Sequence, residues 1–403
     1  MINKTAMICF WILSRIVIDS WPSFFYNNPV EYFNFPRLHT AFFIVYFLLN
    51  INLITIKKNR QLVFLMCLSP LAILVSGIYN GIEIYKFQIL IYWIYFFAAM
   101  LFFLRFGKRI DFIFIMKCLA MSFLFVVFMQ MYYVFVEGMA VHHNLLRTAG
   151  GFDHVTKTSE YAFFALLASM MLYFAERKGM WLFFLLAALV SLGLSGYRTM
   201  WLATLVFLLP SQFLGTTRRK VRLGILVSCF LVFVFLYWDF VFLVYNDLFL
   251  VVNNVKEVFD FNNINYDSLM SGRVFIWKYL IYKVGQLGPI GFLFGMGPLA
   301  STDILGLYAH NEFISSYSET GLLGVAAYSF FCAYLFWICF KNKNIYLFSL
   351  VVSFVVYSFG TMPMRHVVYL FFFCFYFTFF YLKLHREKGF GDFSLKSVPD
   401  LRL

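Results

Sequence analysis

Apolar windows of about twenty residues recur along this chain and constrain its fold more than any other feature. A helix needs roughly 20 apolar residues to cross a hydrocarbon core of about 30 Å, and such windows follow one another from Ala6 to Leu382. Of the 403 residues 63% are apolar and 13% are charged, whereas soluble domains have roughly 45–50% and about 25%. The sequence therefore predicts an all-α polytopic integral membrane protein, with one transmembrane domain over residues 1–403.

About twelve windows qualify as transmembrane helices, with boundaries known to within a few residues. They cover 6–21, 38–56, 61–80, 87–104, 112–135, 159–175, 180–196, 199–215, 223–245, 313–340, 345–360 and 367–382. The last window contains the phenylalanine-rich run from Phe371 to Phe380, which we expect to face lipid.

Basic residues cluster in every second connection between these windows. The clusters are Lys57, Lys58 and Arg60; Arg105, Lys108 and Arg109; Arg177 and Lys178; Arg218, Arg219, Lys220 and Arg222; Lys341 and Lys343; and Lys383, Arg386 and Lys388. Because short basic loops stay on the cytoplasmic side, the alternation predicts a bacterial inner-membrane protein with both termini in the cytoplasm. The same loops account for the net charge of +13, so nucleic acid is not an expected partner.

One extracytoplasmic connection, residues 246–312 between spans 9 and 10, is far longer than the usual connection of about 4–6 residues. We expect it to form a small lid-like subdomain on the periplasmic side. Ser271 is placed to cap a helix inside it that ends near Gly285 and the Gly288-Pro289 pair. The apolar positions of that helix are Val274, Ile276, Trp277, Leu280, Ile281 and Val284.

On the predicted extracytoplasmic side, where topology disfavours cations, four arginines lie next to glycine, histidine or helix ends: Arg147, Arg198, Arg273 and Arg365. Guanidinium groups suit phosphate because their planar fork of donors makes bidentate contacts. The four arginines therefore indicate an anionic ligand such as a diphosphate. The alternative is that each arginine pairs with a lipid phosphate or with a nearby carboxylate and anchors a helix end.

Three segments around these arginines carry a recognisable order of motifs. They are Ser195-Gly196-Tyr197-Arg198; Ser271-Gly272-Arg273 with Trp277; and Gly295-Met296-Gly297 followed by His310-Asn311-Glu312 and Glu319-Thr320-Gly321-Leu322-Leu323-Gly324. This order resembles the O-antigen ligase and polymerase superfamily over roughly residues 191–324. The segment around Arg147 resembles a further part of the family pattern.

The resemblance implies an inverting, metal-independent glycosyltransferase that moves a glycan from undecaprenyl diphosphate to an acceptor hydroxyl. Arg198 and Arg273 would then bind the diphosphate and stabilise its developing charge, and His310 would take the acceptor proton, since its ordinary pKa of about 6.5 lies near the working pH. The alternative for His310 is a helix cap. No cofactor is expected.

Further residues are expected to contact the substrate: Arg147, Asn311, Glu312, Glu319 and Arg365. Glu312 and Glu319 are seven positions apart, so they share a helix face, where they grip sugar, orient His310 or simply meet solvent. Arg365 and His366 lie in the last extracytoplasmic turn and are candidates to join the site. His142 and His143 lack partners at metal-ligand spacing, so no metal is predicted.

Two reactions fit the shared motifs. A polymerase extends a lipid-linked repeat unit, whereas a ligase moves the glycan to lipid A core. We favour the polymerase because the aromatic-rich chain is similar to those of serotype-specific polysaccharide clusters. A lipid-linked oligosaccharide flippase is the rival class, but few ionisable residues lie mid-span here. The expected partners are the lipid-linked donor, the glycan acceptor, membrane lipids and a chain-length regulator protein.

Overall fold

The computed structural model describes residues 3–20, 35–81, 83–136, 140–142, 145–147, 154–211, 272–306 and 308–383, and the single positions 227, 257 and 260. The first half contains α1 (Lys4–Ser20), α3 (Phe35–Leu49), α4 (Leu53–Lys58), α5 (Arg60–Tyr79), the short 3-10 helix η1 (Ile84–Gln88), α6 (Ile89–Phe106), α7 (Phe112–Val136), β1 (Ala140–His142), β2 (Leu145–Arg147) and α8 (Val155–Glu176). The second half contains α9 (Met180–Ser195), α10 (Arg198–Ser211), α14 (Arg273–Gln286), α15 (Gly288–Phe294), α16 (Ala300–Leu305), α17 (Glu312–Asn342), α18 (Ile345–Gly360), the 3-10 turn η3 (Pro363–Arg365) and α19 (Val367–Lys383).

The described part of the chain is predominantly helical, and 5 of its helices are long and apolar enough to cross a membrane. These are Arg60–Tyr79, Lys86–Phe106, Phe112–Val136, Val155–Glu176 and Glu312–Asn342. Shorter apolar helices occupy most of the other predicted windows. The window 223–245 lies outside the described residues, apart from position 227.

The predicted span 38–56 is wrong as a single helix. The chain leaves α3 after Leu49 and begins α4 at Leu53. Asn52 has an extended backbone, and its side chain accepts a hydrogen bond from the Thr55 backbone N–H. An asparagine in this position starts a new helix because its side-chain oxygen satisfies an N–H that the first turn leaves without a partner. The break therefore follows from local capping.

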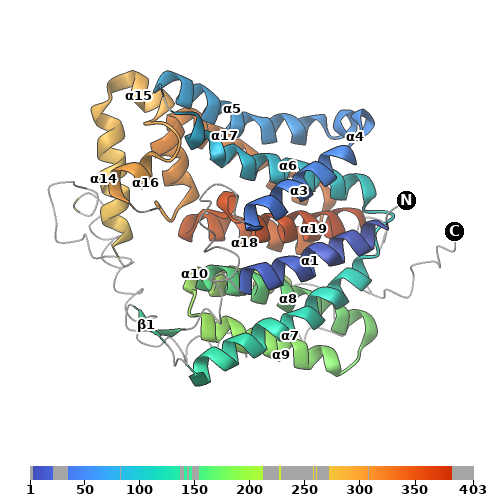
Figure 1. Cartoon of the computed structure of the whole chain (residues 1–403). Coiled ribbons are helices and arrows are strands. Elements are labelled where there is room, and N and C mark those ends of the chain that lie inside the picture. The colour runs from blue at the N-terminus through green and yellow to red at the C-terminus, as the bar shows by residue number, and fades with distance from the viewer. Residues whose placement is uncertain are drawn as a thin grey trace.

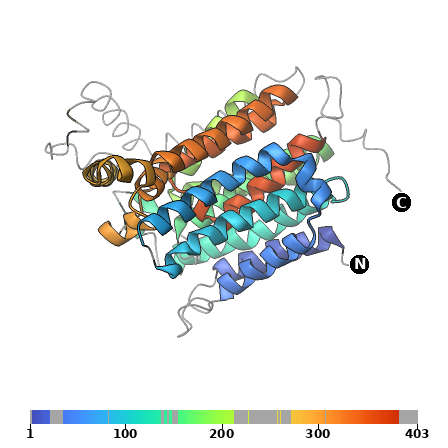
Figure 2. The same ribbon diagram turned by 90° about the horizontal axis from the view of Figure 1, so that it is seen from above.

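The apolar helices lie side by side in one bundle (Figure 1). Helices α14, α15 and α16 gather at one end of it, whereas α1 begins and α19 ends at the other. Figure 2 shows α14 nearly end-on, so this helix crosses the direction of the bundle. We call the end that carries α14 the α14 end.

Helix α19 is the centre of the bundle, which corrects the expectation that its phenylalanines face lipid. Phe371, Phe373, Phe375 and Phe380 are all fully buried. Aromatic rings of α19 contact rings on surrounding helices: Trp11 of α1, Phe96 of α6, Phe112 of α7, Phe164 of α8, Phe207 of α10 and Phe354 of α18. A helix that is apolar all round suits lipid and a protein core equally well. Packing against the surrounding helices, not apolarity, places α19 in the core.

Polar contacts tie several predicted basic connections to the end opposite α14. Arg105, at the end of α6, donates to the Asn50 carbonyl after α3. Glu176, at the end of α8, pairs with both Lys117 and Lys178. Arg105 and Lys178, which belong to two of the predicted basic clusters, therefore lie at the same end of the bundle.

The described part of the long connection includes α14, α15 and α16. Trp277 of α14 donates to the Ala309 carbonyl before α17, the ring of Phe292 in α15 contacts Tyr317 of α17, and Asp303 of α16 pairs with Lys86 of η1. Its main helix was predicted, but the cap was wrong. Gly272, not Ser271, is the N-cap of α14, with a left-handed φ of 81° and no side-chain cap. Ser271 itself lies outside the described residues. Ile281 is exposed, so the buried face is narrower than predicted.

Two glycine motifs form one backbone junction between α15 and α17. Helix α17 is kinked at Gly321, where φ is 64° and ψ is −155°. The kink leaves carbonyls without helical partners, and Met296 N–H donates to Ser318 O at 2.8 Å while Gly297 N–H donates to Glu319 O at 3.0 Å. The Ser76 hydroxyl also donates to Glu319 O, at 2.6 Å. The Gly-x-Gly segment thus supplies hydrogen-bond donors to the broken helix.

Candidate functional site

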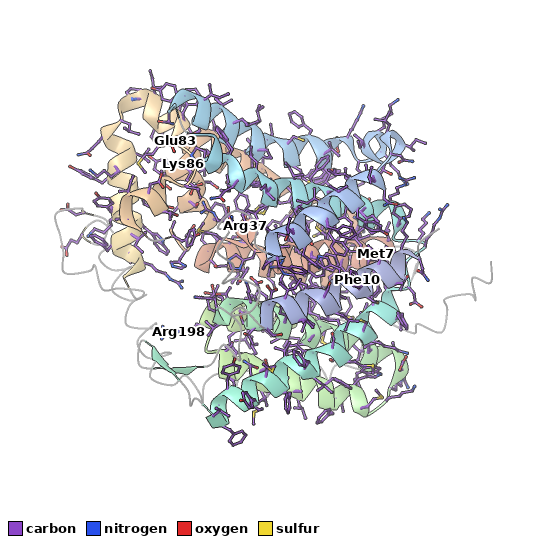
Figure 3. All side chains as sticks on the ribbon, viewed as in Figure 1. Met7, Phe10, Arg37, Glu83, Lys86 and Arg198 are labelled. Atoms are coloured by element: carbon purple, nitrogen blue, oxygen red, sulfur yellow. The ribbon has the colours of Figure 1, made fainter. Side chains whose placement is uncertain are left out.

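The sequence-predicted residues that the structure describes gather at the α14 end of the bundle. Figure 3 labels Arg198, Glu83 and Lys86 at this end, whereas Met7 and Phe10 lie toward the opposite end. The site is built from the starts of α8, α10, α14 and α17, the end of α18, and the turn η3. These elements come from segments far apart in the sequence.

Helix α14 spans the site with two side chains on one face. Arg273 donates from Nη1 to the Gly360 carbonyl at 3.1 Å, and Trp277 donates from Nε1 to the Ala309 carbonyl at 2.8 Å. Residues four apart lie on the same helix face. One turn of α14 therefore joins the end of α18 to the segment that carries His310.

His310 has a strained backbone and a half-buried side chain. Its φ is 50°, in the left-handed region that non-glycine residues rarely occupy. The pKa of His310 is lowered to about 4, chiefly by burial and in addition by its electrostatic interactions with Arg273, His154 and His366. The imidazole is therefore neutral at pH 7. Strain of this kind persists only where the surroundings hold the residue, often at functional sites.

Asn311, not His310, caps α17. Its side-chain oxygen accepts from the N–H groups of Phe313 and Ile314, and its Nδ2 donates to the Phe359 carbonyl at 3.2 Å. The cap alternative for His310 is therefore wrong. His310 makes no hydrogen bond to another described side chain.

We expect Asn311→Ala to destabilise the protein by about 1 kcal/mol, because an N-cap is lost. We also expect it to lower activity, because Asn311 directly follows His310. Asn344→Ala is the matched control. Asn344 caps α18 in the same way, and its Nδ2 donates to the Phe380 carbonyl, at the opposite end of the bundle. Thermal unfolding in detergent should change alike in both variants, and activity should fall only in the first. Equal activity in both would argue against a role for this segment.

Arg365 and the two predicted glutamates form a buried ionic cluster between η3 and α17. Arg365 Nη2 pairs with Glu319 Oε1 and donates to the Ser315 hydroxyl at 3.1 Å. Glu312 Oε2 accepts from the Met364 N–H at 3.2 Å. Both glutamates are buried, so they share a face as predicted and the solvated alternative is wrong. Neither is hydrogen-bonded to His310.

Arg365 has hydrogen-bond donors that no described residue accepts from. Its side chain is 9% exposed, and its Nε and Nη1 atoms are buried without a hydrogen-bond partner among the described residues. The guanidinium carbon lies 5.4 Å from the ring centre of Tyr308, a cation–π distance. A buried guanidinium with free donors is suited to an anion or to sugar hydroxyls.

His366 is bound to a buried carboxylate that the sequence analysis did not select. Its Nδ1 lies 2.6 Å from Glu160 Oε1, and the Tyr357 hydroxyl donates to the same oxygen at 2.6 Å. Glu160 is 0% exposed, and its other oxygen has no partner among the described residues. A carboxylate near the start of an otherwise apolar window, as in α8, is the signal that identifies it, because acids inside such windows are costly.

Arg198 begins α10 next to residues that face Arg273. The turn before it is closed by Gly196, whose φ of 62° reverses the chain. A Cβ on Gly360 would lie 2.3 Å from the Thr199 side chain, so the start of α10 packs on the carbonyl group that Arg273 binds. Burial raises the pKa of the Tyr197 hydroxyl, while Arg273 acts in the opposite direction.

Arg147 is placed by its backbone alone. It pairs with Ala140 in the hairpin of β1 and β2, and β1 lies toward the α14 end (Figure 1). Its side chain lies outside the described residues, as does His143. Within the described residues no group of three or more His, Cys, Asp or Glu side chains is arranged to hold a metal.

No protein-family model matches this chain, and no curated protein matches it. The interpretation of the site therefore rests on the motif order in the sequence and on the geometry described above.

Proposed function

We propose that this chain is a polytopic inner-membrane glycosyltransferase that polymerises surface-polysaccharide repeat units at the periplasmic face. In this proposal about twelve helices span the membrane, both termini are cytoplasmic, and the donor is an undecaprenyl-diphosphate-linked oligosaccharide. The clustering of basic residues at the end opposite α14 supports the orientation. In the proposed orientation the site lies on the extracytoplasmic side.

The observation that carries the proposal is the meeting of cations and imidazoles from distant segments at one end of the bundle. Arg273 and His366 are both near enough to His310 for their charges to lower its pKa. Tyr197, next to Arg198, is within the electrostatic reach of Arg273. Glycosyl transfer from a diphosphate donor uses this combination, because charge develops on the departing diphosphate while the acceptor hydroxyl loses a proton.

The arginines have separate parts in the proposed reaction. Arg198 and Arg273 bind the diphosphate and stabilise its developing negative charge. Arg365, with Asn311, Glu312 and Glu319 around it, contacts the glycan, and Arg147 approaches from the hairpin of β1 and β2. His310 lies beside the acceptor hydroxyl. No metal or nucleotide has a role in this scheme.

The ligase that transfers the glycan to lipid A core is the alternative within the same chemistry, because both enzymes use a polyprenyl diphosphate donor. Deleting the gene separates the two. Lipopolysaccharide with a single repeat unit on the core identifies a polymerase, whereas bare core identifies a ligase. If the chain is instead a flippase, the purified protein in detergent will not lengthen the glycan, since detergent leaves no second compartment to transport into.

Arg273 gives the direct test of the site. We expect Arg273→Ala to lower the elongation rate about 10²- to 10³-fold, the usual loss when one charge-stabilising donor is removed. Arg273→Lys should restore only part of it, because an ammonium group lacks the bidentate fork. The readout is the polysaccharide ladder in the complemented deletion strain at matched protein abundance.

Lys283→Ala is the matched control, since Lys283 lies in the last turn of the same helix, 5.4 Å from the Tyr279 ring centre. Its ladder should equal that of the wild type. An intact ladder in Arg273→Ala would make this arginine an anchor for the Gly360 carbonyl, and the proposed site would fail.

A further inference from the structure

The contact between His366 and Glu160 fixes which imidazole nitrogen carries the proton. Glu160 Oε1 already accepts the Tyr357 hydroxyl proton at 2.6 Å. An oxygen that accepts one hydrogen bond in this way can accept a second, so the Nδ1 atom of His366, also at 2.6 Å, is the donor. The lone pair of the neutral ring then lies on Nε2. A carboxylate that holds Nδ1–H in this way fixes both the tautomer and the orientation of the ring.

The side chain of His366 is partly accessible. The side chain is 24% exposed, whereas the carboxylate behind it is 1% exposed. Nε2 makes no hydrogen bond to any side chain that the structure describes. The ring is therefore partly exposed while its orienting carboxylate is buried, and Nε2 is the nitrogen left to accept a proton, as a general base requires.

The groups around His366 come from every neighbouring element. Glu160 belongs to α8, Tyr357 to α18 and Glu312 to α17, while His310 precedes α17 and Arg365 precedes His366 in η3. Among these residues, Glu160 is the carboxylate in direct contact with the ring.

His310 differs from His366 in its partners. It has no carboxylate partner among the described residues, and its low pKa of about 4 makes it a weak proton acceptor. A neutral imidazole of this kind is better suited to donate a hydrogen bond to the substrate than to take its proton.

We infer that His366, held by the buried carboxylate of Glu160, is the general base of the transfer, and that His310 is a neutral hydrogen-bonding group beside it. This inference rests on the proposed function. The acceptor hydroxyl gives its proton to His366 Nε2 while its oxygen forms the new bond to the anomeric carbon of the donor. The bond from that carbon to the diphosphate oxygen breaks, and its electron pair leaves on the diphosphate. The imidazolium then returns the proton to water. Glu160 is a positioning residue.

The test is elongation by the purified full-length protein in detergent, with lipid-linked single repeat units extracted from the deletion strain as the substrate. We expect His366→Ala to lower kcat about 10²- to 10⁴-fold, the usual contribution of a general base. Added imidazole should restore part of the rate in this variant, which a structural role for the side chain would not allow. His310→Asn should keep a larger share of kcat and show no imidazole rescue.

Glu160→Gln keeps a side-chain oxygen for Nδ1–H and removes the charge. We expect its kcat to fall about 10-fold or more, with the KM for the lipid donor unchanged. Glu176→Gln is the matched control on the same helix, because Glu176 pairs with Lys117 at the opposite end of the bundle. It should behave as the wild type. If His366→Ala does not fold, His366→Asn replaces it in the same assay.

The outcomes separate the inference from the function on which it rests. If the wild type fails to elongate the extracted repeat units, the proposed function is wrong. If the wild type elongates them and His366→Ala does so at a similar rate, or if imidazole rescues His310→Asn instead, the function stands and the assignment of the base to His366 is wrong.

Discussion

Replacing Glu319 with alanine is expected to destabilise the protein by about 3–5 kcal/mol, the usual cost of leaving one partner of a buried ion pair unpaired. The side chains of Arg365 and Glu319 are 9% and 3% exposed. Glu319 is the carboxylate that pairs with this guanidinium. The Nε and Nη1 atoms of Arg365 already lack partners among the described residues, so the loss of Glu319 leaves the charge without its paired carboxylate. Thermal unfolding of the purified protein in detergent measures the effect.

Two further variants make this prediction specific. Asp303→Ala removes an ion pair with Lys86 in which Asp303 is 42% exposed, and surface pairs of this kind contribute about 1 kcal/mol or less. The double variant Glu319→Ala with Arg365→Met should regain part of the lost stability, because the buried guanidinium is then removed together with its carboxylate partner. If Glu319→Ala unfolds at the same temperature as Asp303→Ala, the ionic cluster is not buried as described.

Gly321→Ala is expected to cause the second large loss of stability, for two separate reasons. Its φ of 64° and ψ of −155° lie in a region that is essentially restricted to glycine, at a cost of about 1–3 kcal/mol for a residue with a Cβ. In addition, a Cβ at this position would lie 2.4 Å from the backbone carbon and oxygen of Leu293. Backbone atoms cannot turn aside as a flexible side chain can, so α15 would have to separate from α17.

A series of glycine variants separates these two causes. Gly179 has nothing within 4 Å and an ordinary φ of −59°, so Gly179→Ala should be neutral or slightly stabilising. Gly306 has a φ of 63°, a ψ of 8° and nothing within 4 Å, so Gly306→Ala should show the milder left-handed strain without a close approach. The predicted order of melting temperatures is Gly179→Ala, then Gly306→Ala, then Gly321→Ala. Equal melting temperatures for the last two would contradict the close approach of α15 and α17.

The candidate site could be predicted in part because some of its residues stand next to helix ends. Arg198 lies two residues after the glycine that ends α9, and Arg273 directly follows the glycine that caps α14. Asn311 has the residue type of an N-cap, so all three positions were readable from local sequence. His366 was noticed only as a member of the last turn. Glu160 was not predicted as a site residue: its place in an apolar window is a local signal, but its partner is about two hundred residues away along the chain and cannot be read from local sequence.

The sequence by itself determined the helical, membrane-type character of the chain, since the length and apolarity of each window are local properties. It also determined that the basic connections alternate with the windows. Only the tertiary structure decided that the phenylalanines of α19 form the core, that Gly321 breaks α17 against α15, and that Glu160 meets His366. Hydrophobicity specifies that a residue leaves water, but it does not specify whether lipid or another helix replaces the water. That choice, and the pairing of polar groups buried with it, depends on contacts between segments distant in sequence.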